Sequence, residues 1–229
     1  MNEEPEEGQV TARTQSGVDE VNRRYDSTHG VNTWEDVRKP ELEMDQAAKR
    51  FAERYGPTPE QTFHRVLPRL LPDPRSYTFL DLGSGKGKAL FMAAEYQFSK
   101  IIGVELEANL ADICRQNIRT FTSPRQQCFD IELIQADARS VTLPDGDVFL
   151  FLYAPFFGEI LRSVLGTTRE AVAGGGRDVV LCWLDEDVHN TETQAVADIV
   201  ASWGSMLPVE IGRLDDDPGS LLPLVGTFW

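Results

Sequence analysis

The chain has 229 residues, of which 41% are hydrophobic and 26% charged, a composition that suits one globular domain with a full core. No stretch approaches eighteen apolar residues, so the sequence excludes a transmembrane helix and we expect no membrane partner. The formal net charge is −15. General binding to nucleic acid relies on Lys and Arg, so this charge disfavours it and favours cationic partners.

The first twenty residues are predicted to be a disordered acidic tail. Residues 1–20 hold six acidic side chains and few apolar ones, so they bury too little surface to offset the entropy of ordering. They also lack the basic and apolar regions of a secretory signal.

Residues 21–76 are predicted to be an N-terminal helical extension. Apolar residues line one face of 41–55, and Thr58 with Gln61 forms a capping box that predicts a second helix.

From residue 77 onward, short apolar runs alternate with longer helical stretches. The predicted strands are 78–82, 100–106, 131–137, 147–153 and 178–184, and the predicted helices are 86–97, 108–120, 158–173 and 192–202. Two last strands fit at about 206–213 and 221–228, with no clear helix between them. The pattern predicts a doubly wound α/β domain over 77–229, with a mostly parallel seven-stranded sheet and an antiparallel C-terminal hairpin.

A glycine-rich turn follows the first predicted strand. It reads Asp81-Leu82-Gly83-Ser84-Gly85-Lys86-Gly87-Lys88, at a strand-to-helix junction where glycines let the backbone approach a ligand closely. A dinucleotide fingerprint needs a third glycine at the position of Lys88, and a P-loop needs Ser or Thr at the position of Gly87. The turn therefore disfavours a dinucleotide-dependent oxidoreductase and a nucleotide-triphosphate site.

Three carboxylates end successive predicted strands, at the sheet edge where open α/β proteins bind ligands. Asp81 ends the first strand, Glu105 the second and Asp137 the third. An acid in the place of Glu105 accepts hydrogen bonds from the two hydroxyls of a ribose. An acid in the place of Asp137 is suited to accept a hydrogen bond from an exocyclic adenine amine.

On these motifs the chain resembles the class I S-adenosylmethionine-dependent methyltransferases. DLGSGKG is similar to their first motif, GVELEANL to the second and QADA to the third, and the resemblance covers roughly residues 50–229. It implies a Rossmann-like methyltransferase fold with S-adenosylmethionine as cofactor. It also implies that Asp81 and the glycine turn hold the methionine part, that Glu105 binds the ribose and that Asp137 contacts the adenine amine.

A turn upstream of the first motif resembles that of non-SET protein lysine methyltransferases. Tyr55-Gly56-Pro57-Thr58 is similar to their Tyr-Gly-x-Thr turn, which reaches back over the cofactor. The alternative is that Thr58 is only a helix cap and Tyr55 only a core residue. The complete set of expected cofactor-binding residues is Tyr55, Thr58, Asp81, Gly83, Ser84, Gly85, Gly87, Glu105, Leu106, Asp137 and Ala138.

The segment after the fourth strand departs from the family pattern. Relatives commonly carry Asn-Pro-Pro-Tyr or Asn-Pro-Phe there, whereas this chain has Tyr153-Ala154-Pro155-Phe156-Phe157. Ala154 replaces the Asn that orients an accepting nitrogen. The expected catalytic residues are Tyr153, Pro155 and Phe156, with aromatic faces and backbone carbonyls in place of the missing amide. His29, in a segment that could fold over the site, is a further candidate base.

The sequence thus predicts a cytoplasmic methyltransferase that uses S-adenosylmethionine, with a protein lysine or a cationic small molecule as acceptor. Ala154 leaves an alternative open, a non-catalytic cofactor-binding or partner-binding protein of the same fold. The three cysteines (Cys114, Cys128 and Cys182) match neither a disulfide framework nor a zinc pattern, so we expect reduced thiols and no metal.

Overall fold

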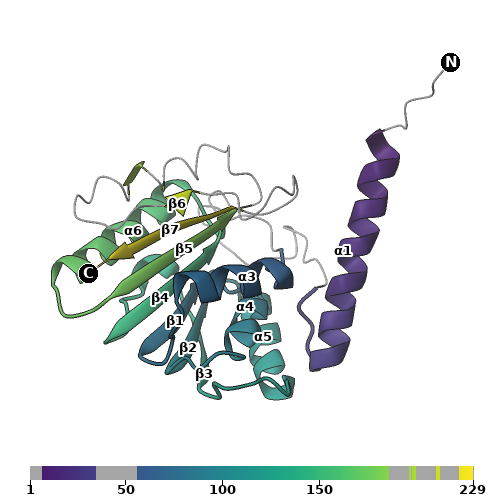
Figure 1. Cartoon of the computed structure of the whole chain (residues 1–229), viewed down its shortest axis with the longest axis horizontal. Helices are drawn as coiled ribbons and strands as arrows, with labels where there is room; N and C mark the ends of the chain where they lie inside the picture. Colours follow the sequence, from purple (N-terminus) through teal and green to yellow (C-terminus); the bar gives the residue numbers. More distant parts are fainter. Residues whose placement is uncertain are drawn as a thin grey trace.

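The structure is a computed structural model, and it describes residues 7–34, 56–185, 196, 198–199, 210–211 and 222–228. The helix predicted over 41–55, with Tyr55 at its end, lies outside the described residues, as does most of the helix predicted over 192–202. Figure 1 shows one twisted sheet with helices against both faces, and a long helix, α1 (Glu7–His29), that extends away from it.

Five parallel strands form the body of the sheet, which confirms the parallel α/β prediction. In spatial order they are β3 (Ile131–Gln135), β2 (Lys100–Glu105), β1 (Tyr77–Leu82), β4 (Asp147–Tyr153) and β5 (Val179–Asp185). Beyond β5, β7 (Leu222–Phe228) pairs antiparallel with β5, and β6 (Glu210–Ile211) pairs antiparallel with β7. The strand order reverses between β1 and β4, and such a switch point opens a crevice for ligands at the carboxyl ends of the strands.

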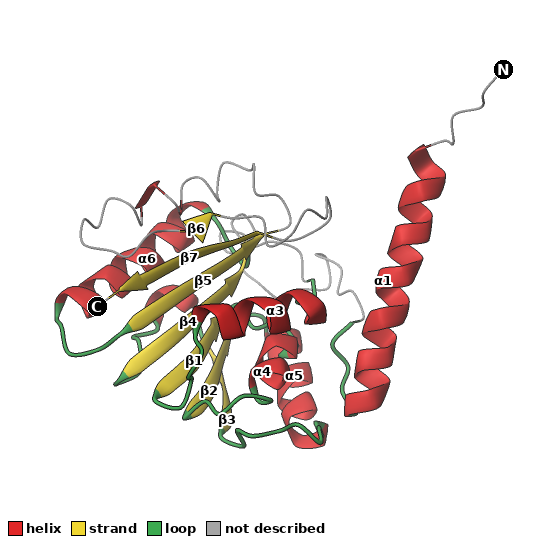
Figure 2. Cartoon of the chain, in the orientation of Figure 1, coloured by secondary structure: helices red, strands yellow, loops and turns green. Residues whose placement is uncertain are grey.

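Different helices cover the two faces of the sheet (Figure 2). On one face lie α3 (Glu60–Leu70), α4 (Lys88–Ala93) and α5 (Ala108–Thr120), and on the other lies α6 (Gly158–Ala173). Phe79 packs with the first group and Leu80 with α6, because successive side chains of a strand point to opposite faces. The same alternation places Asp81 on the face of Phe79, toward α4.

Two helices begin later than the sequence predicted. Helix α3 starts at Glu60, and the residue in its N-cap position is Pro59, so Thr58 lies before the cap and the predicted capping box is wrong. Helix α4 starts at Lys88 and ends at Ala93, not at 86–97 as predicted. The residue before it, Gly87, has a φ of 91°, a left-handed conformation that cannot belong to an α-helix.

The disorder expected of residues 1–20 stays a prediction, and the structure describes residues 7–20 of this segment. They form the first part of α1 (Glu7–His29), which is continuous through residue 20. No proline interrupts this stretch, so its sequence permits the backbone hydrogen bonds of a helix. Val18 and Val21 are exposed, whereas Asn22 and Tyr25 are buried, so contact with the domain starts near residue 22.

In the described part of the chain, every helix is too short or too polar to cross a membrane.

Candidate functional site

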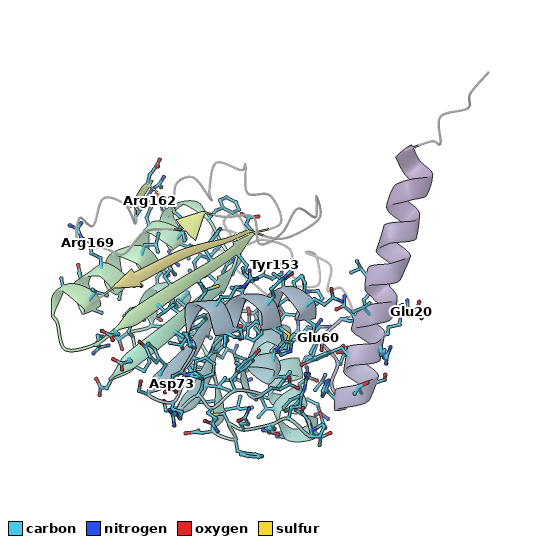
Figure 3. The ribbon with its side chains drawn as sticks, in the orientation of Figure 1. Glu20, Glu60, Asp73, Tyr153, Arg162 and Arg169 are labelled. Atoms are coloured by element: carbon cyan, nitrogen blue, oxygen red, sulfur yellow. The ribbon has the colours of Figure 1, made fainter. Side chains whose placement is uncertain are left out.

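A cavity opens at the carboxyl ends of β1, β2, β3 and β4. Its empty space is about 980 Å³, open solvent at its mouth included. Figure 3 labels Tyr153 at this edge and Asp73 at the opposite edge of the sheet. The cavity brings together most of the residues singled out in the sequence, namely Thr58, Asp81, Gly83, Ser84, Gly85, Glu105, Leu106, Asp137, Ala138, Tyr153, Pro155 and Phe156.

Asp81 supplies a buried carboxylate to the cavity wall. It is 4% exposed, and within the described residues no hydrogen bond to its side chain is found. Burial raises its pKa well above the ordinary value, and the nearby Glu105 raises it further. A carboxylate in this condition is stabilised by a cation. The ammonium and sulfonium of S-adenosylmethionine are such cations, so Asp81 fits the cofactor that the motifs imply.

Glu105 ties the glycine turn to the end of β2. Its Oε2 accepts a hydrogen bond from the Gly85 N–H at 2.8 Å, and its Oε1 accepts one from the Glu107 N–H at 2.8 Å. Burial raises the pKa of Glu105, while these two bonds act in the opposite direction. Each carboxylate oxygen has a second lone pair, so the side chain retains acceptor capacity for two hydroxyls.

Glu107 is a cavity residue that the sequence analysis missed. It is fully buried, and its Oε2 accepts a hydrogen bond from the Leu110 N–H at 2.7 Å, which caps the start of α5. A Glu three residues before the first buried apolar residue of a predicted helix was the signal that could have identified it as a cap. Other lining residues that the expected set did not include are Gly56, Pro57, Lys88, Ala89, Val104, Leu110, Ala136, Ala154 and Ile160.

Asp137 lines the cavity but already has a partner. Its carboxylate accepts hydrogen bonds from Nε of Arg139 at 3.0 and 3.1 Å and from the backbone N–H of the same residue at 2.9 Å. The Arg139 guanidinium lowers the pKa of Asp137. Since the side chain is 27% exposed, this ion pair lies at the rim of the site. An adenine amine would share the carboxylate with Arg139.

The loop after β4 touches the glycine turn. A Cβ at Gly83, whose φ is 85°, would lie 2.4 Å from Cβ of Pro155, so only glycine permits this approach. The preceding Ala154 has a φ of 33°, a positive value that is uncommon for a side chain other than Asn, Asp or Gly. The backbone here adopts a conformation suited to the Asn of the family pattern although Ala occupies the position.

Three expectations need correction or lie outside the structure. Gly87 does not line the cavity; a Cβ there would lie 2.7 Å from Sγ of Cys114, so this glycine lets the turn pack on α5. His29 is not in the site, because it is buried beside Phe121 and its Nδ1 lies 3.0 Å from the Thr122 carbonyl oxygen. Tyr55 lies outside the described residues, so its expected role stays a prediction.

A family model described as a methyltransferase domain matches residues 79–176. The match runs from within β1 to just past α6 and therefore includes the glycine turn, Glu105, Asp137 and the loop after β4. No curated protein sequence matches the chain.

Several solved methyltransferase structures share this fold. An S-adenosylmethionine-dependent methyltransferase from Aquifex aeolicus has a TM-score of 0.53 and 13% identity, and the match covers 81% of this chain and 94% of that one. Precorrin-6y C5,15-methyltransferase from Geobacter metallireducens GS-15 has a TM-score of 0.51 and 12% identity, and the match covers 87% of this chain and 99% of that one. Magnesium protoporphyrin IX methyltransferase from Synechocystis PCC 6803, solved with bound S-adenosylmethionine, has a TM-score of 0.50 and 12% identity. That match covers 74% of this chain and 79% of the other. At these identities the likeness concerns the fold.

Proposed function

We propose that this chain is an S-adenosylmethionine-dependent methyltransferase on the class I fold, and that it methylates an amine, either a protein lysine or a cationic small molecule. One observation carries the proposal. A single cavity joins the buried carboxylates of Asp81 and Glu105 to the aromatic side chains of Tyr153 and Phe156. Carboxylates suit a cationic cofactor, and aromatic faces attract a cationic acceptor.

The cofactor-binding side of the cavity is assigned to the first three strand ends. S-adenosylmethionine supplies a methyl group already activated by its sulfonium. The glycine turn and Asp81 are proposed to hold the methionine part, Glu105 the ribose, and Asp137 with Ala138 the adenine. Binding here fixes the methyl carbon relative to the loop after β4, and alignment of reactants is the main catalytic requirement of a displacement reaction.

The acceptor side is assigned to the loop after β4. Tyr153 and Phe156 lie in the cavity wall next to Pro155, which packs on Gly83. They are proposed to orient an amine through their ring faces, and to exclude water from the reacting atoms. The strongly acidic chain, with a net charge of −15, favours the approach of a basic peptide or a cationic metabolite over that of a polyanion.

A second candidate function is cofactor or partner binding without methyl transfer. Ala154 supports it, because a side-chain amide that orients the accepting nitrogen is absent. In that case Asp81 and Glu105 still bind S-adenosylmethionine, and no acceptor is modified.

The two functions are separated by transfer of a labelled methyl group. The chain is incubated with methyl-labelled S-adenosylmethionine and a basic peptide that contains Lys, and a matched peptide that contains Arg in its place serves as control. Label in the Lys peptide alone supports lysine methylation. Label in a small amine from a cell extract supports the metabolite alternative. Tight cofactor binding with no labelled product from either source favours the non-catalytic function.

A further inference from the structure

Lys88 is a buried lysine in the cavity wall, at the first position of α4. The residue is 2% exposed. Its Nζ donates a hydrogen bond to Oδ1 of Asn22 at 2.6 Å and lies 4.8 Å from the centre of the Tyr25 ring. Both partners belong to α1, so a helix far upstream in the sequence contacts a side chain of the cavity wall.

The positive charge of Lys88 has no carboxylate bonded to it among the described residues. An ammonium has three donors, of which Asn22 uses one, and an amide oxygen together with a ring face compensates a buried charge only in part. Burial lowers the pKa of Lys88 to about 8, although Glu60 and Asp26, the negative groups that face it, oppose this shift. A carboxylate that enters the cavity would complete the pairing of this charge.

Asp81 places the opposite charge in the wall of the same cavity. Within the described residues neither side chain is ion-paired, and the two lie at opposite ends of the glycine turn. The methionine part of S-adenosylmethionine carries one ammonium and one carboxylate. A buried anion and a buried cation that flank one turn are complementary to those two groups.

The end of α1 is anchored firmly enough to hold Lys88 in place. Asp26 accepts hydrogen bonds from the Thr33 N–H at 2.6 Å, the Thr33 hydroxyl at 2.6 Å and the Trp34 N–H at 2.9 Å, which closes the turn after the helix. Asn117 of α5 then donates to the Asn32 carbonyl at 2.9 Å and accepts from the Asn32 N–H at 2.8 Å. These contacts attach α1 to α5, beside the glycine turn.

We infer that Lys88 binds the carboxylate of the cofactor's methionine part, and that α1 is a positioning element which holds Lys88 through Asn22 and Tyr25. The inference rests on the proposed cofactor site and adds to it a specificity for the amino-acid end of the cofactor. It also makes residues 22–25 necessary for tight cofactor binding although they lie outside the matched domain.

The test compares S-adenosylmethionine with decarboxylated S-adenosylmethionine, which lacks only the carboxylate. Affinities of the full chain for both are measured by titration calorimetry. Lys88→Met is expected to weaken binding of S-adenosylmethionine by about 10- to 100-fold, in the range of a lost charge-assisted hydrogen bond. Binding of the decarboxylated compound is expected to change by less than about twofold, because it makes no such bond. Asn22→Leu is expected to give the same selectivity with a smaller loss.

Lys100→Met is the control. Lys100 begins β2, its Nζ pairs with Oε2 of Glu132 at 2.7 Å, and it does not line the cavity. Its replacement should leave the ratio of the two affinities unchanged. If Met is not tolerated at position 88, Lys88→Gln removes the charge and retains a polar end.

The outcomes separate this inference from the function on which it rests. An equal loss for both compounds in the Lys88 variants, or no loss for either, overturns the inference while the cofactor assignment stands. Absence of binding of both compounds to the wild-type chain instead refutes the cofactor assignment itself.

Discussion

Gly83 and Pro155 are in contact across the switch point of the sheet, so the glycine turn and the loop after β4 form one rigid wall. A Cβ added to Gly83 would lie 2.4 Å from Cβ of Pro155. Because the proposed cofactor side and the proposed acceptor side of the cavity meet here, we expect the spacing between them to depend on the absence of a side chain at Gly83.

Gly83→Ala is expected to lower the stability of the chain by about 2–4 kcal/mol, from a left-handed backbone and a clash with Pro155 together. Gly146→Ala measures the cost of the left-handed backbone without a clash, since Gly146 has a φ of 80° and nothing lies within 4 Å of its added Cβ. Chemical denaturation of both variants measures the difference. Equal losses would show that the loop after β4 moves aside without cost.

Glu105→Ala is expected to weaken S-adenosylmethionine binding by about 1.5–3 kcal/mol, through loss of charge-assisted hydrogen bonds to the ribose. It also leaves the N–H groups of Gly85 and Glu107 without their acceptor, so the melting temperature should fall as well. Calorimetry on a variant shown to be folded by circular dichroism measures the affinity. Asp112→Ala, an exposed acid on α5, is the control that should change neither quantity. An unchanged affinity in folded Glu105→Ala would reject the ribose assignment.

Asp81→Asn is expected to stabilise the ligand-free chain while it abolishes tight cofactor binding. The pKa of Asp81 is raised on folding, so wild-type stability is favoured at low pH and is lost as the pH rises toward the folded-state pKa. A neutral Asn lacks this dependence, and the gain in melting temperature over wild type should therefore grow from acid to neutral pH. Thermal melts across that range check the sign. A constant difference would mean that the Asp81 carboxylate is not desolvated.

Ala154→Asn is expected to leave cofactor affinity unchanged and to alter only methyl transfer. Asn also tolerates the positive φ of 33° at this position better than Ala does, so stability should stay equal or increase. Tyr153→Ala should reduce transfer far more than it reduces cofactor binding. Calorimetry combined with labelled-methyl transfer separates the two effects. A loss of cofactor affinity in Ala154→Asn as large as that in Glu105→Ala would place this loop on the cofactor side.

Deletion of residues 1–20 is expected to leave the melting temperature and the cofactor affinity unchanged. The buried contacts of α1 start at Asn22, and Val18 is exposed. A longer deletion that also removes residues 21–34 should lower both quantities, because it takes away Asn22, Tyr25 and the Asp26 turn. A large effect of the shorter deletion would show that the first turns of α1 contact the domain.

Local sequence pattern determined the parallel sheet and the position of the site on it. The alternation of apolar strands with helical stretches is a short-range signal, and parallel topology brings all strand ends to one edge. Asp81, Glu105 and Asp137 could therefore be assigned to a common cavity before any side chain was placed. The methyl acceptor leaves no comparable pattern, because its specificity depends on the shape of the wall around Tyr153 and Phe156.

Tertiary structure alone decided which partners these residues have. Lys88 was noted in the sequence only because it breaks a dinucleotide fingerprint, and its bond to Asn22 joins positions 66 residues apart. The role of Gly87 against Cys114 likewise depends on how distant segments pack, whereas the pairing of Asp137 with Arg139 is a local contact two residues apart. Composition measures how much surface a segment can bury, so it gave no sign that residues 7–20 lie in α1. A periodic pattern specifies which face of an element is buried, whereas the identity of the neighbour on that face is set by how distant segments pack.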